Sequence, residues 1–200
     1  MLSSSTKFFI FFIIFLALLA IVWVFVYAPA PAPEAVSYDT NRPERGNPQA
    51  KVVVTEYADF SCIHCQALKP EMDNLYQKYS AQVKFTYRYL PISQASIQID
   101  IAAECAQRQG FFWPYANILF ANNGVATDTQ LLDWATQLPL NQAAFQQCLS
   151  QKATLPVVEY DIAQAFKLDI NSAPTVFVNS EPVDNSALES AITRALAAQP

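Results

Sequence analysis

Two cysteines three residues apart, Cys62 and Cys65, are the side chains of this sequence best suited to chemistry, and His64 lies between them. Cysteine thiolates bind zinc, form structural disulfides and attack disulfides in other molecules. The motif Cys62-Ile63-His64-Cys65 is therefore open to three interpretations: half of a zinc site, a structural disulfide, or a redox-active pair. Each interpretation predicts different features elsewhere in the chain.

Zinc and a purely structural disulfide both fit the sequence poorly. A structural zinc site needs four Cys or His ligands, often from two such motifs. The chain has one motif, two isolated cysteines at positions 105 and 148, and no histidine besides His64, so we expect no metal site. A disulfide between Cys62 and Cys65 would close a very short loop, which removes little entropy from the unfolded chain. The redox interpretation is favoured.

The neighbouring sequence predicts that the pair lies between a strand and a helix. Residues 52–57 are a β-branched and apolar run that is typical of a strand. Apolar residues at three- and four-residue spacings predict an amphipathic helix over 65–79, with a kink at Pro70. The first turn of a helix has unpaired N–H groups and the positive end of the helix dipole, and both stabilise a thiolate. This position favours redox chemistry at Cys62 and Cys65.

The rest of the sequence predicts further strands around a long helical tract. Alternation with a period of two predicts a strand over 83–89, and a second β-type run follows at 174–178. A final helix is expected over 186–197. The tract over 94–168 predicts several helices, divided at Gly110, at 122–124, at Pro139 and at Pro156. This order of elements predicts an α/β domain with a helical insertion.

Several element ends are predicted from single residues. Thr127 or Asp128, and later Asn141, are candidate N-caps. Ser186 and Glu189 fit the Ser-x-x-Glu capping box at the start of the last helix. A proline at position 182 would place any last strand at an edge of the sheet, because proline cannot donate to a neighbouring strand.

A charge-free apolar segment runs from residue 8 to residue 27. About 20 residues are enough for a helix to cross a hydrocarbon core of roughly 30 Å, so we expect an uncleaved transmembrane anchor. A cleaved signal peptide is the alternative, but Pro31 follows the small-x-small site at 28–30. Lys7 precedes the segment, which by the positive-inside rule places residues 1–7 in the cytoplasm and the remainder outside.

An Ala- and Pro-rich linker is predicted over 28–48, followed by one domain over 49–200. All 17 acidic residues but only 11 of the 12 basic ones lie beyond the apolar segment, and no basic run is present. Nucleic acid is therefore not an expected partner, since binding to it depends on neutralising phosphates.

Taken together, these motifs resemble the thioredoxin superfamily, and within it the bacterial DsbA-like thiol-disulfide oxidoreductases. The resemblance rests on a strand followed by Phe-Ser-Cys-Ile-His-Cys at 60–65, on Ser-Ala-Pro-Thr at 172–175 before a late strand, and on Gly-Phe-Phe-Trp at 110–113. It extends over about residues 50–198. It implies a thioredoxin fold with a helical insertion at about 94–168.

The resemblance also implies a role for each residue of the motif. Cys62 would be the exposed nucleophile, and Cys65 its more buried partner. His64 would stabilise the Cys62 thiolate; the alternative is a solvent-exposed helix residue without a role. Pro174 would be a cis-proline that faces the pair, and the backbone of Ala173 would bind an extended substrate segment. Many relatives have Thr or Val where this sequence has Ala173.

Three more residues receive two interpretations each. Glu56, six residues before Cys62, matches a buried acid that assists proton transfer with the second cysteine, or it is a strand residue that faces solvent. Cys105 and Cys148 form a second, structural disulfide in the insertion, as in some DsbA-like proteins, or they are two reduced cysteines of the core.

The function implied by the resemblance is the donation of disulfides to unfolded or reduced exported proteins. A stabilised thiolate at Cys62 would make the disulfide a stronger oxidant. No cofactor is expected, and a quinone-linked membrane protein of DsbB or vitamin K epoxide reductase type would re-oxidise the pair. The catalytic domain would lie on the periplasmic or extracellular side of the cell membrane. The alternatives are a reductase or isomerase with the same fold, and a copper-handling assembly factor without enzymatic activity.

Overall fold

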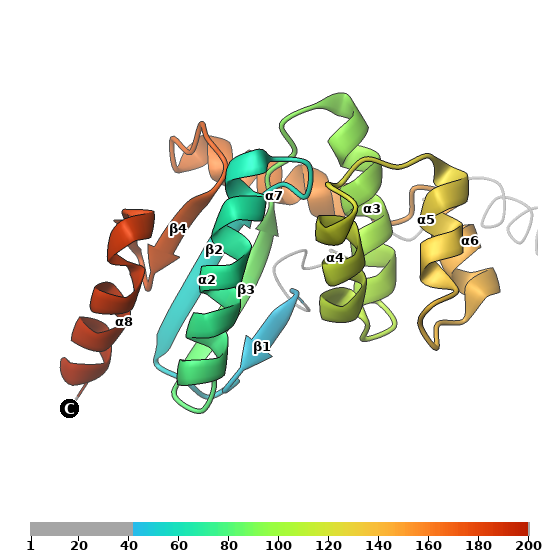
Figure 1. Ribbon diagram of the computed structural model, residues 1–200. Helices are drawn as coiled ribbons and strands as arrows, with labels where there is room; N and C mark the ends of the chain where they lie inside the picture. Colours follow the sequence, from blue (N-terminus) through green and yellow to red (C-terminus); the bar gives the residue numbers. More distant parts are fainter. Residues whose placement is uncertain (1–41, 200) are drawn as a thin grey trace, which may run out of the picture. The chain divides into compact units, whose positions relative to one another are not determined.

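A five-stranded mixed sheet forms the centre of the computed structural model, which describes residues 42–199 (Figure 1). The strands are ordered β1-β3-β2-β4-β5, with β2 and β3 parallel and all other neighbours antiparallel. Their bounds are β1 (Glu44–Gly46), β2 (Val52–Ala58), β3 (Val83–Tyr89), β4 (Thr175–Val178) and β5 (Glu181–Val183). The predicted strands are confirmed, and β2 lies at the middle of the sheet.

The predicted cytoplasmic N-terminus (1–7), the predicted transmembrane segment (8–27) and the linker up to residue 41 lie outside the described residues. Between residues 42 and 199, no helix combines the length and the apolar character that a membrane span requires.

A parallel β-α-β unit at the centre of the fold carries the cysteine motif. β2 and β3 are joined by α2 (Ile63–Tyr79), which begins two residues earlier than the sequence predicts and runs without a break through Pro70. Its apolar face buries Leu68, Met72 and Leu75 against the sheet. This burial fixes the direction of α2, so that its first turn lies beside the end of β2.

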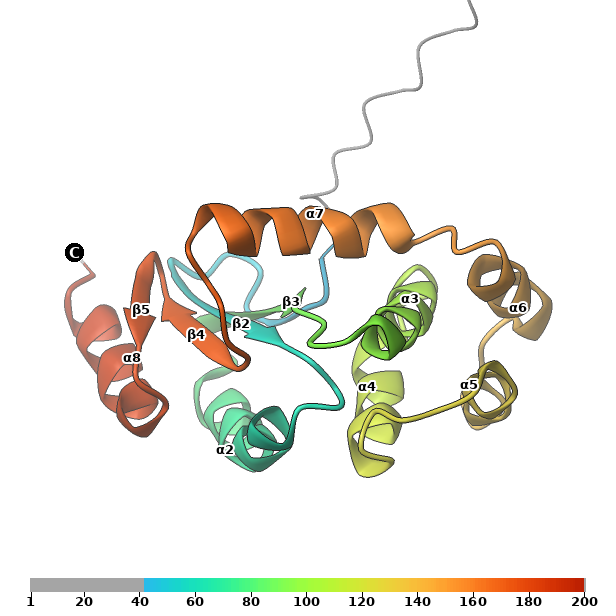
Figure 2. The ribbon, with the colours of Figure 1, turned by 90° about the horizontal axis from the view of Figure 1, so that it is seen from above.

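Helices cover both faces of the sheet (Figure 2). α2 shares one hydrophobic core with α8 (Leu188–Ala197), and α7 (Leu155–Lys167) lies on the opposite face. The fully buried carboxylate of Asp161 in α7 accepts hydrogen bonds of 3.0 Å from Arg42 Nη1 and from the backbone N–H of Tyr89. These charge-assisted contacts join α7 to β3 and to the start of the described chain.

The helical insertion is confirmed and consists of four helices that lead into α7. The bounds of these four helices are α3 (Gln94–Gln107), α4 (Phe112–Ala121), α5 (Asp128–Ala135) and α6 (Gln142–Ser150). The predicted break at Pro156 is confirmed to within a few residues: α6 ends at Ser150, and this proline lies in the first turn of α7, where its missing N–H needs no partner.

Two predicted helix caps are confirmed and one is wrong. The Thr127 side chain accepts from the N–H of Gln130 in a capping box, and Asn141 caps α6. The predicted box between Ser186 and Glu189 does not form. A short 3₁₀ turn, η1 (Asn185–Ala187), precedes α8 and is capped by Asp184, while Glu189 binds Lys78 and Tyr79.

The edges of the sheet differ from the prediction in one place. β1 falls within residues 28–48, so the predicted linker ends too late: Glu44–Gly46 pair with β3 and belong to the folded domain. A strand of three residues is too short to show the alternation of apolar and polar side chains from which strands are predicted. At the other edge, β5 contains Pro182, as the sequence predicts.

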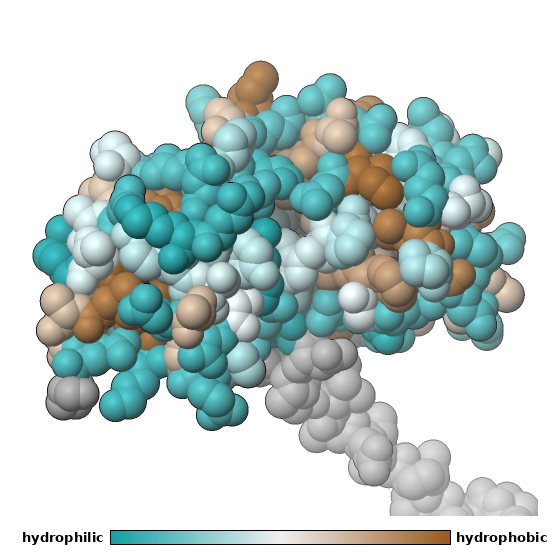
Figure 3. All heavy atoms as spheres, turned by 60° about the horizontal axis from the view of Figure 1, so that its bottom comes forward, coloured by the Kyte–Doolittle hydropathy of each residue, from teal (hydrophilic) through white to brown (hydrophobic). Residues whose placement is uncertain are grey.

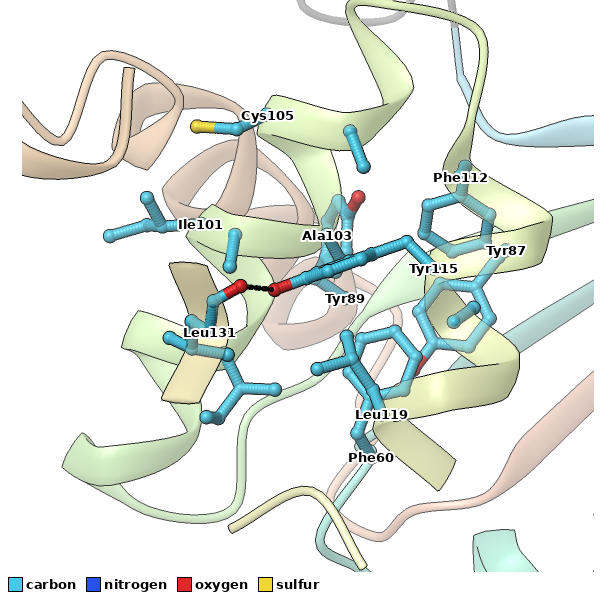
Figure 4. Packing of buried hydrophobic residues seen from close by; sticks show 14 of the residues in the cluster. Phe60, Tyr87, Tyr89, Ile101, Ala103, Cys105, Phe112, Tyr115, Leu119 and Leu131 are labelled. Carbon is cyan, nitrogen blue, oxygen red and sulfur yellow. Dashed lines mark hydrogen bonds between the residues drawn. The ribbon is translucent and has the colours of Figure 1, made fainter. Parts of the chain in front are cut away.

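One hydrophobic core joins the sheet to the insertion (Figure 4). The Phe60 ring stacks on Tyr87 with 5.2 Å between ring centroids, and Phe112 lies 5.2 Å from Tyr87. Tyr115, fully buried in α4, donates a hydrogen bond of 2.8 Å to the backbone carbonyl of Leu131. Since Phe60 lies two residues before Cys62, the packing of the insertion also fixes the position of the cysteine motif.

The face of the molecule in Figure 3 is mostly hydrophilic, and its hydrophobic residues lie in small, separate patches.

A disulfide between Cys105 and Cys148 joins α3 to α6. Of the two interpretations of these cysteines, the bonded one is therefore confirmed. The bond closes a loop with a sequence separation of 43 residues, which contributes about 4 kcal/mol in the chain-entropy model.

We expect reduction of this disulfide to lower the free energy of unfolding by roughly 2–4 kcal/mol. Urea unfolding of a Cys62→Ala/Cys65→Ala variant, with and without a reductant, isolates this bond from the active-site pair. A variant that also lacks Cys105 and Cys148 is the control and should not respond to the reductant. Equal stability of the reduced and oxidised double variant would contradict the expectation.

Candidate active site

Cys62 and Cys65 lie at the start of α2, directly after β2. Cys62 is the N-cap residue, and its carbonyl accepts from the N–H of Gln66 at 3.0 Å. No side chain of the described residues caps this end of the helix. The N–H groups of the first turn are therefore available to stabilise negative charge on sulfur.

Both cysteines are free thiols and both are buried, which corrects the prediction of an exposed Cys62. The exposed fraction is 6% for Cys62 and 0% for Cys65. Cys62 is covered because the segment before β4 lies over it: its Sγ donates to the carbonyl oxygen of Ala173 at 3.3 Å. Cys62 remains the more accessible of the two sulfurs.

The two thiols differ in their surroundings. Burial raises the pKa of Cys65 well above its ordinary value, and a hydrogen bond from the backbone of Asp59 only partly opposes this effect. The reduced protein therefore keeps Cys65 protonated. Cys62, in contrast, lies at the N-terminus of α2 and is less completely buried.

The peptide bond between Ala173 and Pro174 is cis, as the resemblance implies, and lies beside the pair. Thr175, the first residue of β4, donates from Oγ1 to the carbonyl of Ser172 at 2.7 Å and closes the turn. The structure thus brings Ala173 and Cys62 together. The substrate-binding role of Ala173 and Pro174 stays a prediction.

His64 is exposed on the first turn of α2, one residue from Cys65. This placement fits both interpretations of His64, so its effect on the Cys62 thiolate stays a prediction.

Glu56 is buried, with an exposed fraction of 8%, which decides against the solvent-facing alternative. It lies in β2 on the face that packs against α2, like Val54 two residues before it. Burial raises the pKa of Glu56 from 4.5 to about 7, and the cations of Arg45 and Lys69 oppose the rise. Its carboxyl is one of the groups that act on the Cys65 thiol. A proton donor near neutral pH therefore lies behind the pair.

Sequence reasoning missed Asp59, which holds the loop before the motif. Its buried carboxylate accepts from Ser61 N at 2.5 Å, from Ser61 Oγ at 2.6 Å and from Ile92 N at 2.7 Å. Its carbonyl accepts from the N–H of Cys62 at 3.2 Å. The pattern Asp-x-Ser directly after a strand is typical of an Asx turn and could have identified this residue.

Sequence reasoning also missed the contact between Gly124 and the active-site loop. A Cβ atom on Gly124 would lie 2.3 Å from the carbonyl carbon of Phe60 and 2.4 Å from Ser61 N. The loop between α4 and α5 therefore packs against the motif at backbone distance, which only glycine permits.

Three exposed apolar side chains come from segments that meet around Cys62. Ile63, Ile92 and Val125 are 72%, 57% and 71% exposed. Ile92 follows β3 and is held by Asp59, and Val125 follows Gly124. Between these segments lies an open cavity of about 140 Å³, lined by Ser61, Ser93, Ala95, Ser96, Ile99, Gly124, Val125 and Ala126.

A family model described as thioredoxin matches residues 39–198. The chain belongs to the thioredoxin family. Among solved structures, it is similar to BdbD from Bacillus subtilis, with a TM-score of 0.68, 22% identity and coverage of 78% of this chain and 91% of that one. A thioredoxin-like oxidoreductase from Silicibacter pomeroyi has a TM-score of 0.68 and 26% identity, over 81% of this chain and 96% of that one.

The same fold occurs in the thiol-disulfide exchange protein α-DsbA2 from Wolbachia pipientis, with a TM-score of 0.67 and 18% identity, over 79% of this chain and 89% of that one. The DsbA-like thioredoxin fold predicted from the sequence is thus confirmed. This fold and its two free thiols support a thiol-disulfide redox enzyme.

The curated relatives that the chain matches are named as Na⁺/H⁺ antiporters. The chain is 31% identical to the Na⁺/H⁺ antiporter NhaA 3 of Salinispora tropica, over 76% of this chain and 24% of the relative. It therefore spans about a quarter of the length of the curated relatives that it matches. A match of this extent does not carry the antiport activity to this chain.

We expect Gly124→Ala to destabilise the protein more than Gly110→Ala. Both glycines have a positive φ, +56° and +80°, but a Cβ at Gly110 has no atom within 4 Å. Gly110→Ala should cost about 1 kcal/mol through backbone strain alone, and Gly124→Ala more, because it also displaces the loop at Phe60. Urea unfolding of both variants tests the difference, and equal losses would contradict it.

We expect Glu56→Gln to change stability in a pH-dependent way. Below pH 4.5, Glu56 is protonated in both states; as the pH rises to about 7, the unfolded state releases its proton first, so the wild type loses up to about 3 kcal/mol. The variant lacks this loss and should gain about 1–3 kcal/mol relative to wild type at pH 8 compared with pH 4.5. Urea unfolding at both pH values measures the gain, and a pH-independent difference would contradict it.

Proposed function

We propose that the protein is a thiol-disulfide oxidoreductase that donates the Cys62–Cys65 disulfide to reduced exported proteins. The observation that carries the proposal is the asymmetry of the pair: Cys62 lies at an uncapped helix end, whereas Cys65 is fully buried with a raised pKa. An asymmetric pair reacts in a fixed order, because one sulfur can be attacked and the other can only leave.

The reaction begins when a substrate thiolate attacks Sγ of Cys62. The Cys62–Cys65 bond breaks, a mixed disulfide forms, and Cys65 leaves as a thiolate that takes the proton of Glu56. A second substrate thiolate then attacks the substrate sulfur of the mixed disulfide and releases Cys62 as a thiolate. Two electrons pass from the substrate to the pair, and the substrate gains one disulfide.

The direction proposed is oxidation of the substrate. The unpaired N–H groups of the first turn of α2, and His64 beside them, favour a thiolate at Cys62 and therefore the reduced form of the pair. A cysteine pair whose reduced form is stabilised readily transfers its disulfide to a substrate. A reductase would need the opposite balance.

Unfolded polypeptides are the substrates that the surroundings of Cys62 fit best. The exposed side chains of Ile63, Ile92 and Val125 offer apolar contacts of the kind that folded proteins bury. The backbone beside Pro174 is available for an extended segment next to the disulfide.

The cellular setting is also part of the proposal. The apolar segment 8–27 would anchor the protein with residues 1–7 in the cytoplasm and the catalytic domain on the periplasmic or extracellular side. A quinone-linked membrane protein of DsbB or vitamin K epoxide reductase type would re-oxidise the pair. The disulfide between Cys105 and Cys148 fits an oxidising compartment.

The activity is tested by trapping the mixed disulfide. In Cys65→Ser the Cys62 thiolate can still attack a disulfide of an exported protein, which expels one thiolate of that protein, and Cys65 is no longer present to displace the bound protein from Cys62. Adducts should therefore accumulate on non-reducing gels and disappear with a reductant. The matched control is Cys62→Ser/Cys65→Ser, which should form none. Absence of adducts in the Cys65→Ser variant would refute the proposed oxidoreductase activity.

The direction is tested by the reduction potential of the pair, measured against glutathione. We expect a value well above that of thioredoxin, which is about −270 mV. His64→Ala should lower the potential, since the thiolate loses a neighbouring donor. A wild-type potential near that of thioredoxin would instead support a reductase.

A further inference from the structure

A small cavity beside Glu56 lies within the fold and is lined by both ionisable and apolar side chains. Its volume is about 20 Å³, which is enough for one water molecule. It lies between β1, β2, β3, α2 and α4, and its lining includes the charged side chains of Arg45, Lys69 and Asp73 besides Glu56. Water in such a cavity needs polar partners, and the lining provides them.

Tyr87 supplies a further polar group to this cavity. It lies opposite Glu56 in the register of β2 and β3, and it lines the cavity. Its hydroxyl is buried without a hydrogen-bond partner among the described residues. Burial and the nearby carboxyls of Asp100 and Glu56 raise the pKa of Tyr87, so the group stays a neutral O–H that can donate and accept.

A charged cluster separates the cavity from solvent. Asp73 accepts from Lys69 Nζ at 2.5 Å and from Arg45 Nη2 at 3.0 Å, and these three side chains are 34%, 22% and 16% exposed. Arg45 is held between two rings, 4.2 Å from the centroid of Tyr76 and 4.1 Å from that of Trp113. Asp73 therefore fixes both cations over the cavity that Glu56 lines.

We propose that Asp73, Lys69 and Arg45 are positioning residues for the proton step, and that one water in the cavity joins the Glu56 carboxyl to the Tyr87 hydroxyl. The inference rests on the proposed function, in which Glu56 gives its proton to the Cys65 thiolate when the disulfide opens. The resulting Glu56 carboxylate is stabilised by the two cations and by the O–H of Tyr87 through the water. It regains a proton from solvent before the next cycle.

The groups that face Glu56 predict opposite effects for two neighbouring substitutions. The ionisable groups around Glu56 come from three elements. β1 provides Arg45, β3 provides Tyr87, and α2 provides Cys65, Lys69 and Asp73. The residues that α4 contributes do not titrate: Trp113, Asn117 and Phe120. Loss of a cation destabilises the carboxylate. Asp73→Asn keeps an oxygen that accepts from Lys69 and Arg45 but removes the negative charge, so it stabilises the Glu56 carboxylate.

The test is the titration midpoint of Glu56, measured by carbon-13 NMR of its carboxyl group in the oxidised protein. We expect Lys69→Met to raise this midpoint and Asp73→Asn to lower it, each by about 0.5 pH unit, and Tyr87→Phe to raise it. Glu104 is an internal control: burial also raises its pKa to about 7, but its partners are Tyr89 and Arg42 instead of this cluster. Its midpoint should not move.

A second control is Lys84→Met, which removes another partly buried lysine that pairs with Glu44 outside the cavity. It should leave the Glu56 midpoint unchanged. The same shifts should then be seen in the pH dependence of the reaction of the oxidised protein with a reduced dithiol peptide. Shifts of the same sign for Lys69→Met and Asp73→Asn, or no shift, would overturn the positioning role, and an unchanged midpoint in Tyr87→Phe would overturn the water bridge.

The two proposals fail separately. The Glu56 midpoint is measured without turnover, so it can disprove the cluster while Cys65→Ser still traps substrates. Conversely, a protein that traps no substrate would still show whether Lys69 and Asp73 act on Glu56.

Discussion

The position of the active-site pair depends on one carboxylate, that of Asp59. It is fully buried and accepts hydrogen bonds from the backbone N–H groups of Ser61 and Ile92, while the backbone carbonyl of the same residue accepts from the N–H of Cys62. Together with the packing of Phe60 and the contact of Gly124, it fixes the path of the four residues between β2 and α2. Because the loop is fixed, the helix end and the cis-proline segment meet at Cys62, and the Gly124 loop packs against Phe60 and Ser61 just before it.

The elements of the fold could largely be predicted, because their side-chain periods are long and regular. β2, α2 and β3 follow from apolar spacing, and Thr127 and Asn141 from their capping chemistry. β1 could not be predicted, since three residues carry no period and are defined only by pairing with β3. The cap of α8 was misassigned because the carboxylate of Glu189 has competing partners that come from α2, far away in the sequence.

The chemical site was predicted less completely than the fold. The cysteines and Pro174 could be identified from motifs, but the burial of Cys62 could not, because the covering segment is more than 100 residues away. The surroundings of Glu56 could not be predicted for the same reason, because they come from distant parts of the sequence. Its cations come from β1 and α2 and its hydroxyl neighbour from β3, so only the packed sheet shows that these groups surround one carboxyl.

The disulfide between Cys105 and Cys148 has a consequence for the supply of active protein. Each newly made copy contains a bond of the type that, on the proposed function, older copies form in other chains. A new molecule is then a substrate of the existing molecules before it becomes an active enzyme itself. Such a population renews itself as long as some oxidised molecules persist, and a cell that lost all of them would have to restart the cycle with another oxidant.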